Sequence, residues 1–534
     1  MIKNVIMIVL DTLQFNYLGC YGNDWIQTPN IDRLAAEGIL FENAYTEGSP
    51  TIPTRRAMMT GRYSLPFKGW GPLDPDDTTV ADICMANQCR SALYYDTAPM
   101  HMYKYGYQRG FDEVVFRRGQ ELDLNFYRND PLYHLKAEDF HKPYYIKDEN
   151  GDPVKDENGN PVQSEFSALS YNELLTYLPR RQYWIDDSYQ MIAKLVKRSM
   201  GYFDSYDAEK PFLFWFDSFD PHEPWDPPSV YDPDMKCPYD PDYEGKDLIL
   251  PIMGSTENEE LYTEEELHHI RMLYAEKITT CDKWVGKLLD HIKSKGLYEN
   301  SMIILTTDHG QPLGNGIHGH GIMRKCRPWL YEELVHIPLI IRVPGIAGGQ
   351  RIESFVSTVD MAPTMMDWMG IEDPVRMADM QGQSLLPIMR GETDKIRDYA
   401  IVGYHGFSWG LVTEEWSYIN WLHQDRLEFN ESNRSLAVSD VMLEFYDITS
   451  AISDAQAAAN LGTLKERTKL KELEQKEEIW TCTPGSTTEV PETDELYSRR
   501  DDPFQQNNLL EKHPDTGLEM LKKLREIMLE LKTS

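Results

Sequence analysis

The sequence predicts an α/β protein with a mostly parallel central sheet flanked by helices, followed by a smaller carboxyl-terminal α+β domain that contains an antiparallel sheet. Short apolar segments typical of buried strands alternate with longer amphipathic segments through most of the chain. After Gly391 the pattern changes to short, closely spaced β-type segments. With 534 residues, 41% of them hydrophobic, the chain can bury a large core. We expect a first domain at residues 1–390, with an insertion at about 129–178, and a second at 391–534.

The amino-terminal third supplies the first strands and helices. NVIMIVLD reads as a central strand that ends in the acid Asp11. The next apolar-periodic segment reads as a helix opened by Thr28 and Pro29, because proline suits the first turn of a helix, and a second strand follows it. A helix is predicted near Val80–Ala86 and a strand at Ser91–Tyr95.

The same alternation continues to about residue 310. The pattern predicts a long helix over Tyr183–Tyr202, the strand PFLFWFD, a long helix over Thr263–Ser294, and the strand SMIILTTD. Parallel sheets bind ligands at the carboxyl ends of their strands. We therefore expect Asp11, Asp217 and Asp308 to share that edge.

Other segments are expected at the periphery. The repeat KDENGDPVKDENGNPV predicts a hairpin within the insertion, which would shape or cover a pocket. The polar, proline-rich residues Asp226–Asn258 read as another surface excursion. In the second domain a charged helix is expected near Leu461–Glu478, and a final helix at Thr516–Leu531 should pack that domain onto the first.

Bulk charge limits the partners. Lys and Arg total 53 against 87 Asp and Glu, a formal net charge of −34, which disfavours nucleic acid and anionic membranes as partners. A small anionic substrate would then need a local basic pocket. The apolar run from Val5 to Leu10 is too short for a signal peptide, and no segment is apolar enough to span a bilayer, so we expect a cytoplasmic protein. Seven scattered cysteines predict neither a disulfide framework nor a structural zinc site.

One ordered set of motifs gives a resemblance. The segment SPTIPTRRAMMTGR, residues 49–62, resembles the sulfatase signature of Cys or Ser, any residue, Pro, any residue, Arg and a Thr-Gly-Arg tail, and departs from it only at Thr51. TPNIDRLAAEG precedes it, and DHG, HGIMRK, YEELVHIPLIIRVPG, VDMAPTMMDWMGI, QGQSLLP and DDPFQQNNLL follow in the family's order. The chain thus resembles, nearly end to end, the sulfatase branch of the alkaline phosphatase superfamily.

This resemblance implies one divalent metal ion at the strand ends, held by Asp11, Asp308 and His309, with Thr51 at its edge as the nucleophile. The residue types agree, because a metal bound by carboxylates and imidazole would lower the pKa of a coordinated hydroxyl. Arg55, one helical turn after Thr51, would steady the nucleophile and the bound oxyanion.

Three further groups would act on the substrate, namely Lys325, His222 and His320. Lys325 and His222 would donate to the transferred group or to the leaving group. His320 rather than His318 keeps the family's spacing to Lys325. Each residue also has a plain structural reading, since strand-end acids often cap helices or form turns and loop histidines are often simply hydrogen-bonded.

Two departures from the sulfatase pattern bear on the reaction. Sulfatases oxidise Cys or Ser to formylglycine, and threonine cannot give that aldehyde, so no formylglycine is expected. A metal-bound threonine hydroxyl can still attack phosphorus. Thr12 stands where sulfatases usually carry a second acid, which makes the site less negative and favours manganese, zinc or iron, with calcium as a less suited alternative.

A third departure concerns substrate binding. The Gly-Lys-Trp-His segment of sulfatases is missing, and YYDT, residues 94–97, stands in its place. This resembles the Tyr-x-Thr of phosphonate monoester hydrolases, carried here by Tyr95 and Thr97. The leading hypothesis is therefore hydrolysis of phosphate diesters or phosphonate monoesters through Thr51, with sulfate esters as a weaker activity.

Three alternatives stay open. The protein could be a sulfatase that uses an unmodified threonine, or a phosphoryl transferase resembling the phosphoethanolamine transferases, although those carry membrane segments. It could also be a catalytically inactive sulfatase-like protein that binds anionic glycans or lipids, but the retained Asp11, Asp308, His309, Arg55 and Lys325 argue against that. The chain could also form homo-oligomers.

Overall fold

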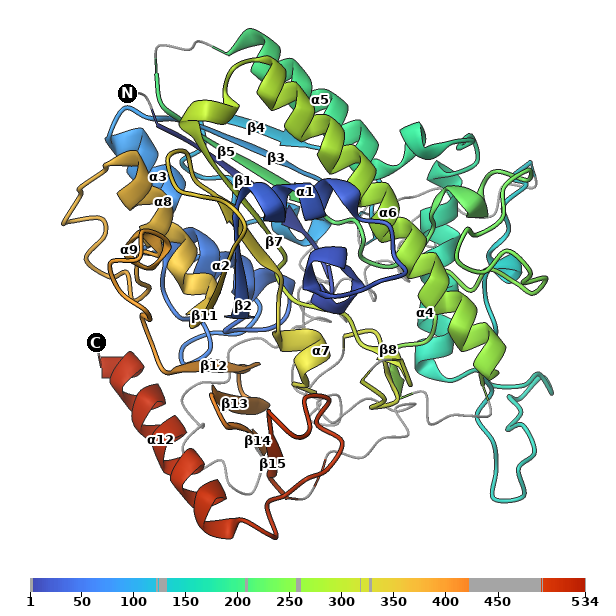
Figure 1. Cartoon of the computed structure of the whole chain (residues 1–534). Helices are drawn as coiled ribbons and strands as arrows, with labels where there is room; N and C mark the ends of the chain where they lie inside the picture. The colour runs from blue at the N-terminus through green and yellow to red at the C-terminus, as the bar shows by residue number, and fades with distance from the viewer. Residues whose placement is uncertain are drawn as a thin grey trace, which may run out of the picture.

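A central eight-stranded sheet organises the molecule (Figure 1). The computed structural model describes residues 3–121, 123, 132–206, 210–255, 261–316, 318–325, 329–421, 491 and 493–533. The strand order is β11-β2-β10-β7-β1-β5-β3-β4. Only β10 of these eight strands runs antiparallel to its neighbours, which confirms the mostly parallel sheet. The strands are β1 (Asn4–Leu10), β2 (Ile39–Tyr45), β3 (Arg90–Tyr95), β4 (Glu113–Phe116), β5 (Phe212–Ser218), β7 (Ser301–Thr306), β10 (Leu339–Arg342) and β11 (Gln350–Ser357).

Helices cover both faces of this sheet (Figure 1). Successive side chains of β1 enter opposite cores, Ile6 and Ile8 on one face and Val5 and Met7 on the other. Because the strand is buried on both faces, its sequence is apolar throughout rather than alternating. One face carries α1 (Pro29–Glu37), α5 (Met191–Ser205) and α6 (Glu264–Ser294), and the other carries α2 (Thr51–Thr60), α3 (Val80–Ala86), α8 (Met361–Met369) and α9 (Leu386–Met389).

A separate antiparallel sheet follows near the carboxyl terminus. Its strands, in order, are β12 (Tyr399–Tyr404), β13 (Ser408–Thr413), β14 (Trp416–Trp421) and β15 (Glu495–Ser498). The last helix, α12 (Pro514–Thr533), packs Leu524 and Met528 against Leu411 and Tyr418 of this sheet. The expected fold class, including the smaller antiparallel part, is confirmed. The boundary between residues 390 and 391 remains a prediction, and the charged helix expected near Leu461–Glu478 lies outside the described residues.

One expected helix starts later than the pattern indicated. The helix predicted over Tyr183–Tyr202 begins at Met191, since the chain first makes a separate 3-10 turn at Asp187–Tyr189. The Asp186 carboxylate accepts the backbone N–H of Ser188 at 2.8 Å, and Gln190 is extended. Such local capping competes with helix formation.

The insertion contains two successive tight turns rather than one hairpin. Residues 147 and 153, and then 155 and 161, form antiparallel bridges. Helix α4 (Glu165–Tyr177) follows. Two smaller strands, β8 (Leu313–Gly314) and β9 (Ile322–Met323), lie with β6 (Gly254–Ser255) in a three-stranded sheet, and α7 (Glu332–Val335) comes after them. No helix in the described part of the chain is long and apolar enough to cross a membrane.

Candidate active site

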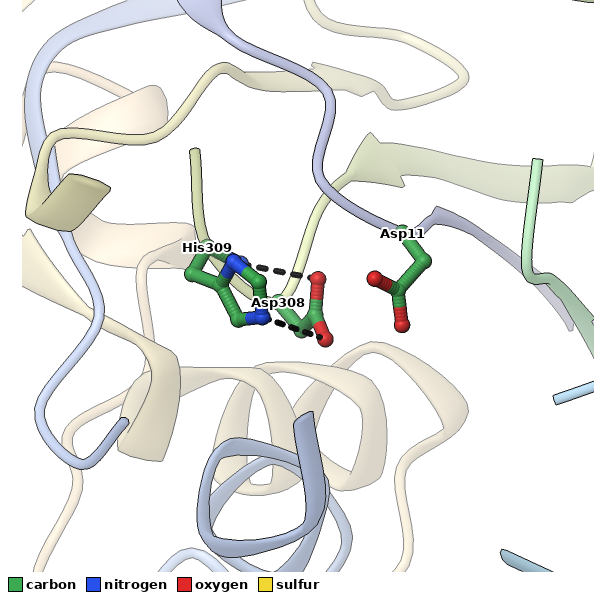
Figure 2. A group of neighbouring side chains, drawn as sticks. All are labelled: Asp11, Asp308 and His309. Carbon is green, nitrogen blue, oxygen red and sulfur yellow. Dashed lines mark hydrogen bonds and ion pairs between the residues drawn. The ribbon is translucent and has the colours of Figure 1, made fainter. Parts of the chain in front are cut away.

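Two acids and a histidine meet at the carboxyl edge of the central sheet. In β1 and β7 Val9 pairs with Thr306, so Asp11 and Asp308, each two residues further on, are level with each other. Parallel pairing therefore brings together acids that are 297 residues apart in sequence. Figure 2 shows both carboxylates beside the imidazole of His309, and ligand atoms of the three lie within 4.8 Å of one another.

The donor set of Asp11, Asp308 and His309 fits a divalent cation. The carboxylate oxygens of Asp11 are buried and accept no hydrogen bond from the described residues; Oδ2 is ion-paired with Arg55 at 2.9 Å, which leaves Oδ1 to face a metal. His309 Nδ1 lies 2.8 Å from the Gly310 carbonyl, which places the ring proton there and leaves Nε2 as the ligand atom. Burial lowers the pKa of His309 to about 4, so the imidazole is neutral near neutral pH. Burial is the largest cause, and the charge of Asp308 the second, of a pKa of Asp11 well above its ordinary value. A bound cation would lower this pKa again, because it favours the ionised carboxylate.

Arg55 is the centre of the local charge pattern. Its guanidinium is fully buried and pairs with Asp11 at 2.9 Å, Asp217 at 2.8 Å and Asp308 at 2.5 Å. Nη1 also donates to the backbone carbonyl of Thr51 at 3.1 Å, one turn earlier in α2. The three acids expected at the sheet edge thus converge on one cation.

Thr51 begins helix α2 and is itself buried. Its Oγ1 lies 3.5 Å from Nε2 of His309, which places the hydroxyl at the edge of the carboxylate–histidine group. Pro53 follows in the first turn, where a missing N–H costs no helical hydrogen bond. The positive end of the helix dipole at this position favours a negative charge on the oxygen or on a bound anion.

Thr12 contributes through its backbone. Its N–H donates to Asp308 Oδ1 at 3.1 Å, and its φ is 60°, which is unusual for a β-branched residue. Its buried hydroxyl has no hydrogen-bond partner among the residues that the structure describes. The strained turn therefore orients Asp308, and the hydroxyl offers a weak oxygen where sulfatases usually present a carboxylate.

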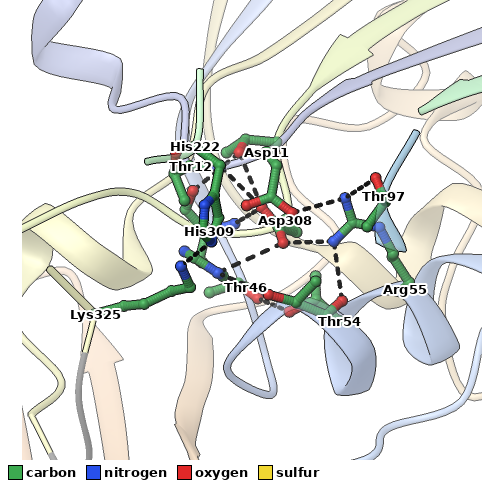
Figure 3. Close-up of polar contacts among 12 residues, drawn as sticks. Asp11, Thr12, Thr46, Thr54, Arg55, Thr97, His222, Asp308, His309 and Lys325 are labelled. Atoms are coloured by element: carbon green, nitrogen blue, oxygen red, sulfur yellow. Dashed lines mark hydrogen bonds and ion pairs between the residues drawn. The ribbon is translucent and has the colours of Figure 1, made fainter. Parts of the chain in front are cut away.

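His222 and Lys325 approach from the side opposite Arg55 (Figure 3). Lys325 Nζ contacts Nε2 of His222 and lies 3.4 Å from a carboxylate oxygen of Glu223. Strand β9, which ends at Met323, leads directly into this segment. The site thus has the Thr51 hydroxyl and the group of Asp11, Asp308 and His309 in the middle, with Arg55 on one side and Lys325 on the other.

The remaining predicted substrate-binding residues lie in different surroundings. Thr97 joins the site, since its hydroxyl donates to Asp217 at 2.6 Å. Tyr95 points into the core on the sheet face that carries α3 and α8, where its hydroxyl meets His101 at 2.7 Å and Gln108 at 2.8 Å. His320 stacks on Tyr331 at 3.7 Å, with Nδ1 3.2 Å from Glu333 and Nε2 3.1 Å from the Gln505 carbonyl. His318 contacts Asn16 at 2.6 Å.

Several residues of the site carried little or no signal in the sequence. Asp217 had one, since it is an acid near the end of a buried strand. Glu223 and Arg324 are the chain neighbours of His222 and Lys325, but no residue spacing connects these two pairs with each other or with Glu121. Only their convergence in three dimensions reveals that group.

With this geometry in view, comparisons with known proteins identify the family. The family model described as Sulfatase matches residues 3–371. The chain belongs to the sulfatase family. A second family model, described as N-sulphoglucosamine sulphohydrolase, C-terminal, matches residues 319–473. Enzymes of this family are ester hydrolases, and they usually use a divalent metal, in keeping with the donor set described above.

Similar proteins span nearly the whole of this sulfatase-family chain. An arylsulfatase of Clostridium perfringens is 25% identical over 504 residues, which cover 90% of this chain and 96% of the relative. An N-acetylglucosamine-6-O-sulfatase of Bacteroides thetaiotaomicron is 25% identical over 430 residues, covering 76% of this chain and 74% of the relative. The crystal structure of a phosphonate monoester hydrolase of Agrobacterium radiobacter shares the fold, with a TM-score of 0.62, 17% identity, and coverage of 99% and 96% of the two chains.

Proposed function

We propose that this protein is a metal-dependent hydrolase of small anionic esters that uses Thr51 as its nucleophile, and that sulfate esters are its first substrate class. The observation that carries the proposal is the position of Thr51 Oγ1, 3.5 Å from His309 Nε2 and beside the carboxylates of Asp11 and Asp308. The sulfatase relatives favour sulfate esters as the substrate class.

The residues of the site have different roles in the proposed reaction. A divalent metal held by Asp11, Asp308 and His309 would lower the pKa of the Thr51 hydroxyl and neutralise charge on the transferred group. The Thr51 hydroxyl gives its proton to solvent water and its oxygen attacks sulfur, the bond to the leaving oxygen breaks, and that oxygen takes a proton from His222 or Lys325. Water then attacks sulfur in the threonine ester and releases sulfate with Thr51 restored.

Arg55 and Lys325 serve as fixed positive charges around the transferred group. Arg55 is held on three sides by carboxylates and on a fourth by the Thr51 carbonyl, so it cannot move far. Preorganised charges of this kind stabilise the transition state without reorganisation. The acidic surface elsewhere, with a net charge of −34, makes these cationic side chains and a bound metal more important for binding an anion.

A second candidate class is phosphate diesters and phosphonate monoesters, the leading hypothesis from the sequence. The observation that favours it is Thr51 itself, since an unmodified alcohol lacks the hydrated-aldehyde route by which sulfatases release sulfate, whereas a phosphothreonine ester can be hydrolysed by water. Of the Tyr-x-Thr pair behind the same hypothesis, Thr97 lies at the site and Tyr95 is directed elsewhere.

The deciding experiment is a substrate panel with a constant leaving group. The panel would compare the turnover of four esters of one phenol: a sulfate ester, a phosphate monoester, a phosphate diester and a phosphonate ester. Each would be measured with protein loaded in turn with manganese, zinc, iron or calcium. Faster turnover of the sulfate ester supports the first class, and faster turnover of the diester or phosphonate supports the second. Absence of hydrolysis with every metal would refute the proposal and favour a binding protein.

A further inference from the structure

A buried network of charged residues contacts the Nδ1 side of His222. Oε2 of Glu121 lies 2.8 Å from Nδ1 of His222, and the backbone carbonyl of Glu223 lies 2.6 Å from the same nitrogen. Phe219 stacks on the ring at 3.9 Å and fixes its plane. The hydrogen bond to the Glu223 carbonyl keeps a proton on Nδ1, the Glu121 carboxylate lies at ion-pair distance from the same nitrogen, and Nε2 is left as the atom that faces the substrate.

Arg324 fixes the carboxylates of this network. It donates to Glu121 at 3.1 Å and to Glu223 at 2.7 Å, and all three side chains are buried. Its φ is 61°, a conformation that non-glycine residues seldom adopt. This strained residue immediately precedes Lys325, so the same turn that clamps the two glutamates also directs Lys325 at Nε2 of His222.

The charges suit a proton-handling group better than a second metal site. Glu121, His222 and Glu223 have the residue types and spacing of metal ligands. However, both carboxylates are already paired with Arg324, and Nδ1 of His222 faces a carbonyl that requires a proton on that nitrogen. Burial raises the pKa of Glu121, but the charges of His222 and Arg324 lower it to about 2, so the carboxylate stays ionised.

We propose that Glu121 is a positioning residue that orients His222 as the general acid for the leaving group. This inference rests on the proposed function. In the first step the ester bond to the leaving oxygen breaks, and that oxygen takes the proton that Nε2 of His222 shares with Nζ of Lys325. Nδ1 keeps its own proton, held by the Glu223 carbonyl beside the Glu121 carboxylate, and the water that later hydrolyses the threonine ester returns a proton to Nε2. A carboxylate behind an imidazole has the same logic as the acid of a catalytic triad.

The insertion takes part in this arrangement through Glu173 of α4. Burial is the largest cause and the Glu121 charge the second of a pKa of Glu173 well above its ordinary value, which favours a protonated carboxyl beside Glu121. The insertion therefore does more than cover the pocket, because it supports the residue that orients His222.

The test compares Glu121→Gln with wild type on esters that differ only in the leaving group. A nitrophenol leaves as an anion and needs no acid, whereas an alkyl alcohol needs a proton. We expect kcat/KM to fall at least about tenfold for an alkyl ester and less than about twofold for the nitrophenyl ester. Glu276→Gln serves as the matched control, because Glu276 is also buried but accepts hydrogen bonds from Ser229. It should leave both rates unchanged.

A double-mutant cycle separates positioning from folding support. If Glu121 acts through His222, Glu121→Gln should cost little further activity in a His222→Ala background. An equal loss for both leaving groups, no loss for either, or an undiminished loss without His222 would overturn the inference while leaving the proposed hydrolase intact. Failure of the wild type to hydrolyse any ester would instead overturn the proposed function and this inference with it.

Discussion

The Arg55→Ala variant gives the sharpest test of the charge arrangement at the site. Removing the guanidinium leaves the carboxylates of Asp11, Asp217 and Asp308 together in a fully buried place without their counter-ion. Breaking a buried ion pair by removing one partner costs about 3–5 kcal/mol. We expect a loss of that size in the free energy of unfolding of the metal-free protein.

The response to metal then separates two roles of Arg55. A divalent ion held by Asp11 and Asp308 would replace part of the lost positive charge, so adding metal should stabilise Arg55→Ala more than wild type. Turnover per folded molecule should still fall at least about tenfold, since the cation that faces the transferred group is gone.

Urea unfolding with and without metal, together with steady-state kinetics, would measure both effects. Arg56→Ala is a matched control on the same helix, because Arg56 is buried and pairs with Asp77 at 2.8 Å. The control should lose stability without a special response to metal and without a specific loss of turnover. If Arg55→Ala behaves like Arg56→Ala in both assays, Arg55 is only structural and the charge argument is wrong.

Three further predictions use other residues. Thr51→Ala should abolish turnover while metal content stays unchanged, and Thr51→Ser should retain part of the rate because serine preserves the attacking oxygen. An unaltered rate in Thr51→Ala would exclude Thr51 as the nucleophile. Asp308→Asn should lower bound metal at least about tenfold in elemental analysis of dialysed protein, and full metal retention would count against the ligand set. Burial raises the pKa of Glu276 to about 7, so the contribution of its protonated carboxyl to stability is complete below the unfolded pKa near 4.5 and is lost as pH rises through about 7. Between pH 4.5 and 7 the unfolding free energy of wild type should therefore fall relative to that of Glu276→Gln. Parallel curves of unfolding free energy against pH would contradict this prediction.

The family's order of motifs and the fold class could be predicted from sequence because they depend on local patterns. Apolar strands buried on both faces leave a continuous hydrophobic run, as in NVIMIVL, and strand-end acids such as Asp11 stand out directly after such runs. The first residue of a helix is harder to predict from sequence. Helix α5 begins only at Met191, because the side chain of Asp186 caps a separate turn within an otherwise helical pattern.

The neighbourhood of each side chain was decided by the tertiary structure. In sequence, Tyr95 and Thr97 form one motif. In the structure, Tyr95 ends strand β3 and its hydroxyl meets His101, whereas Thr97 lies in the turn after the strand and its hydroxyl reaches Asp217. Likewise His320 has the family's spacing but both of its ring nitrogens face Glu333 and Gln505. Spacing fixes position along the chain, whereas contacts depend on how distant segments pack.

The sequence by itself thus determined the family, the sheet and the strand-end residues Asp11, Asp308 and His309, because each leaves a local pattern. The tertiary structure alone decided that Asp217 shares Arg55 with them and that Glu121 stands behind His222. Those pairs are separated by 162 and 101 residues, and long-range charge pairing leaves no periodic trace in a single sequence. Burial then gives these contacts their strength, since the same charges exposed to water would interact only weakly.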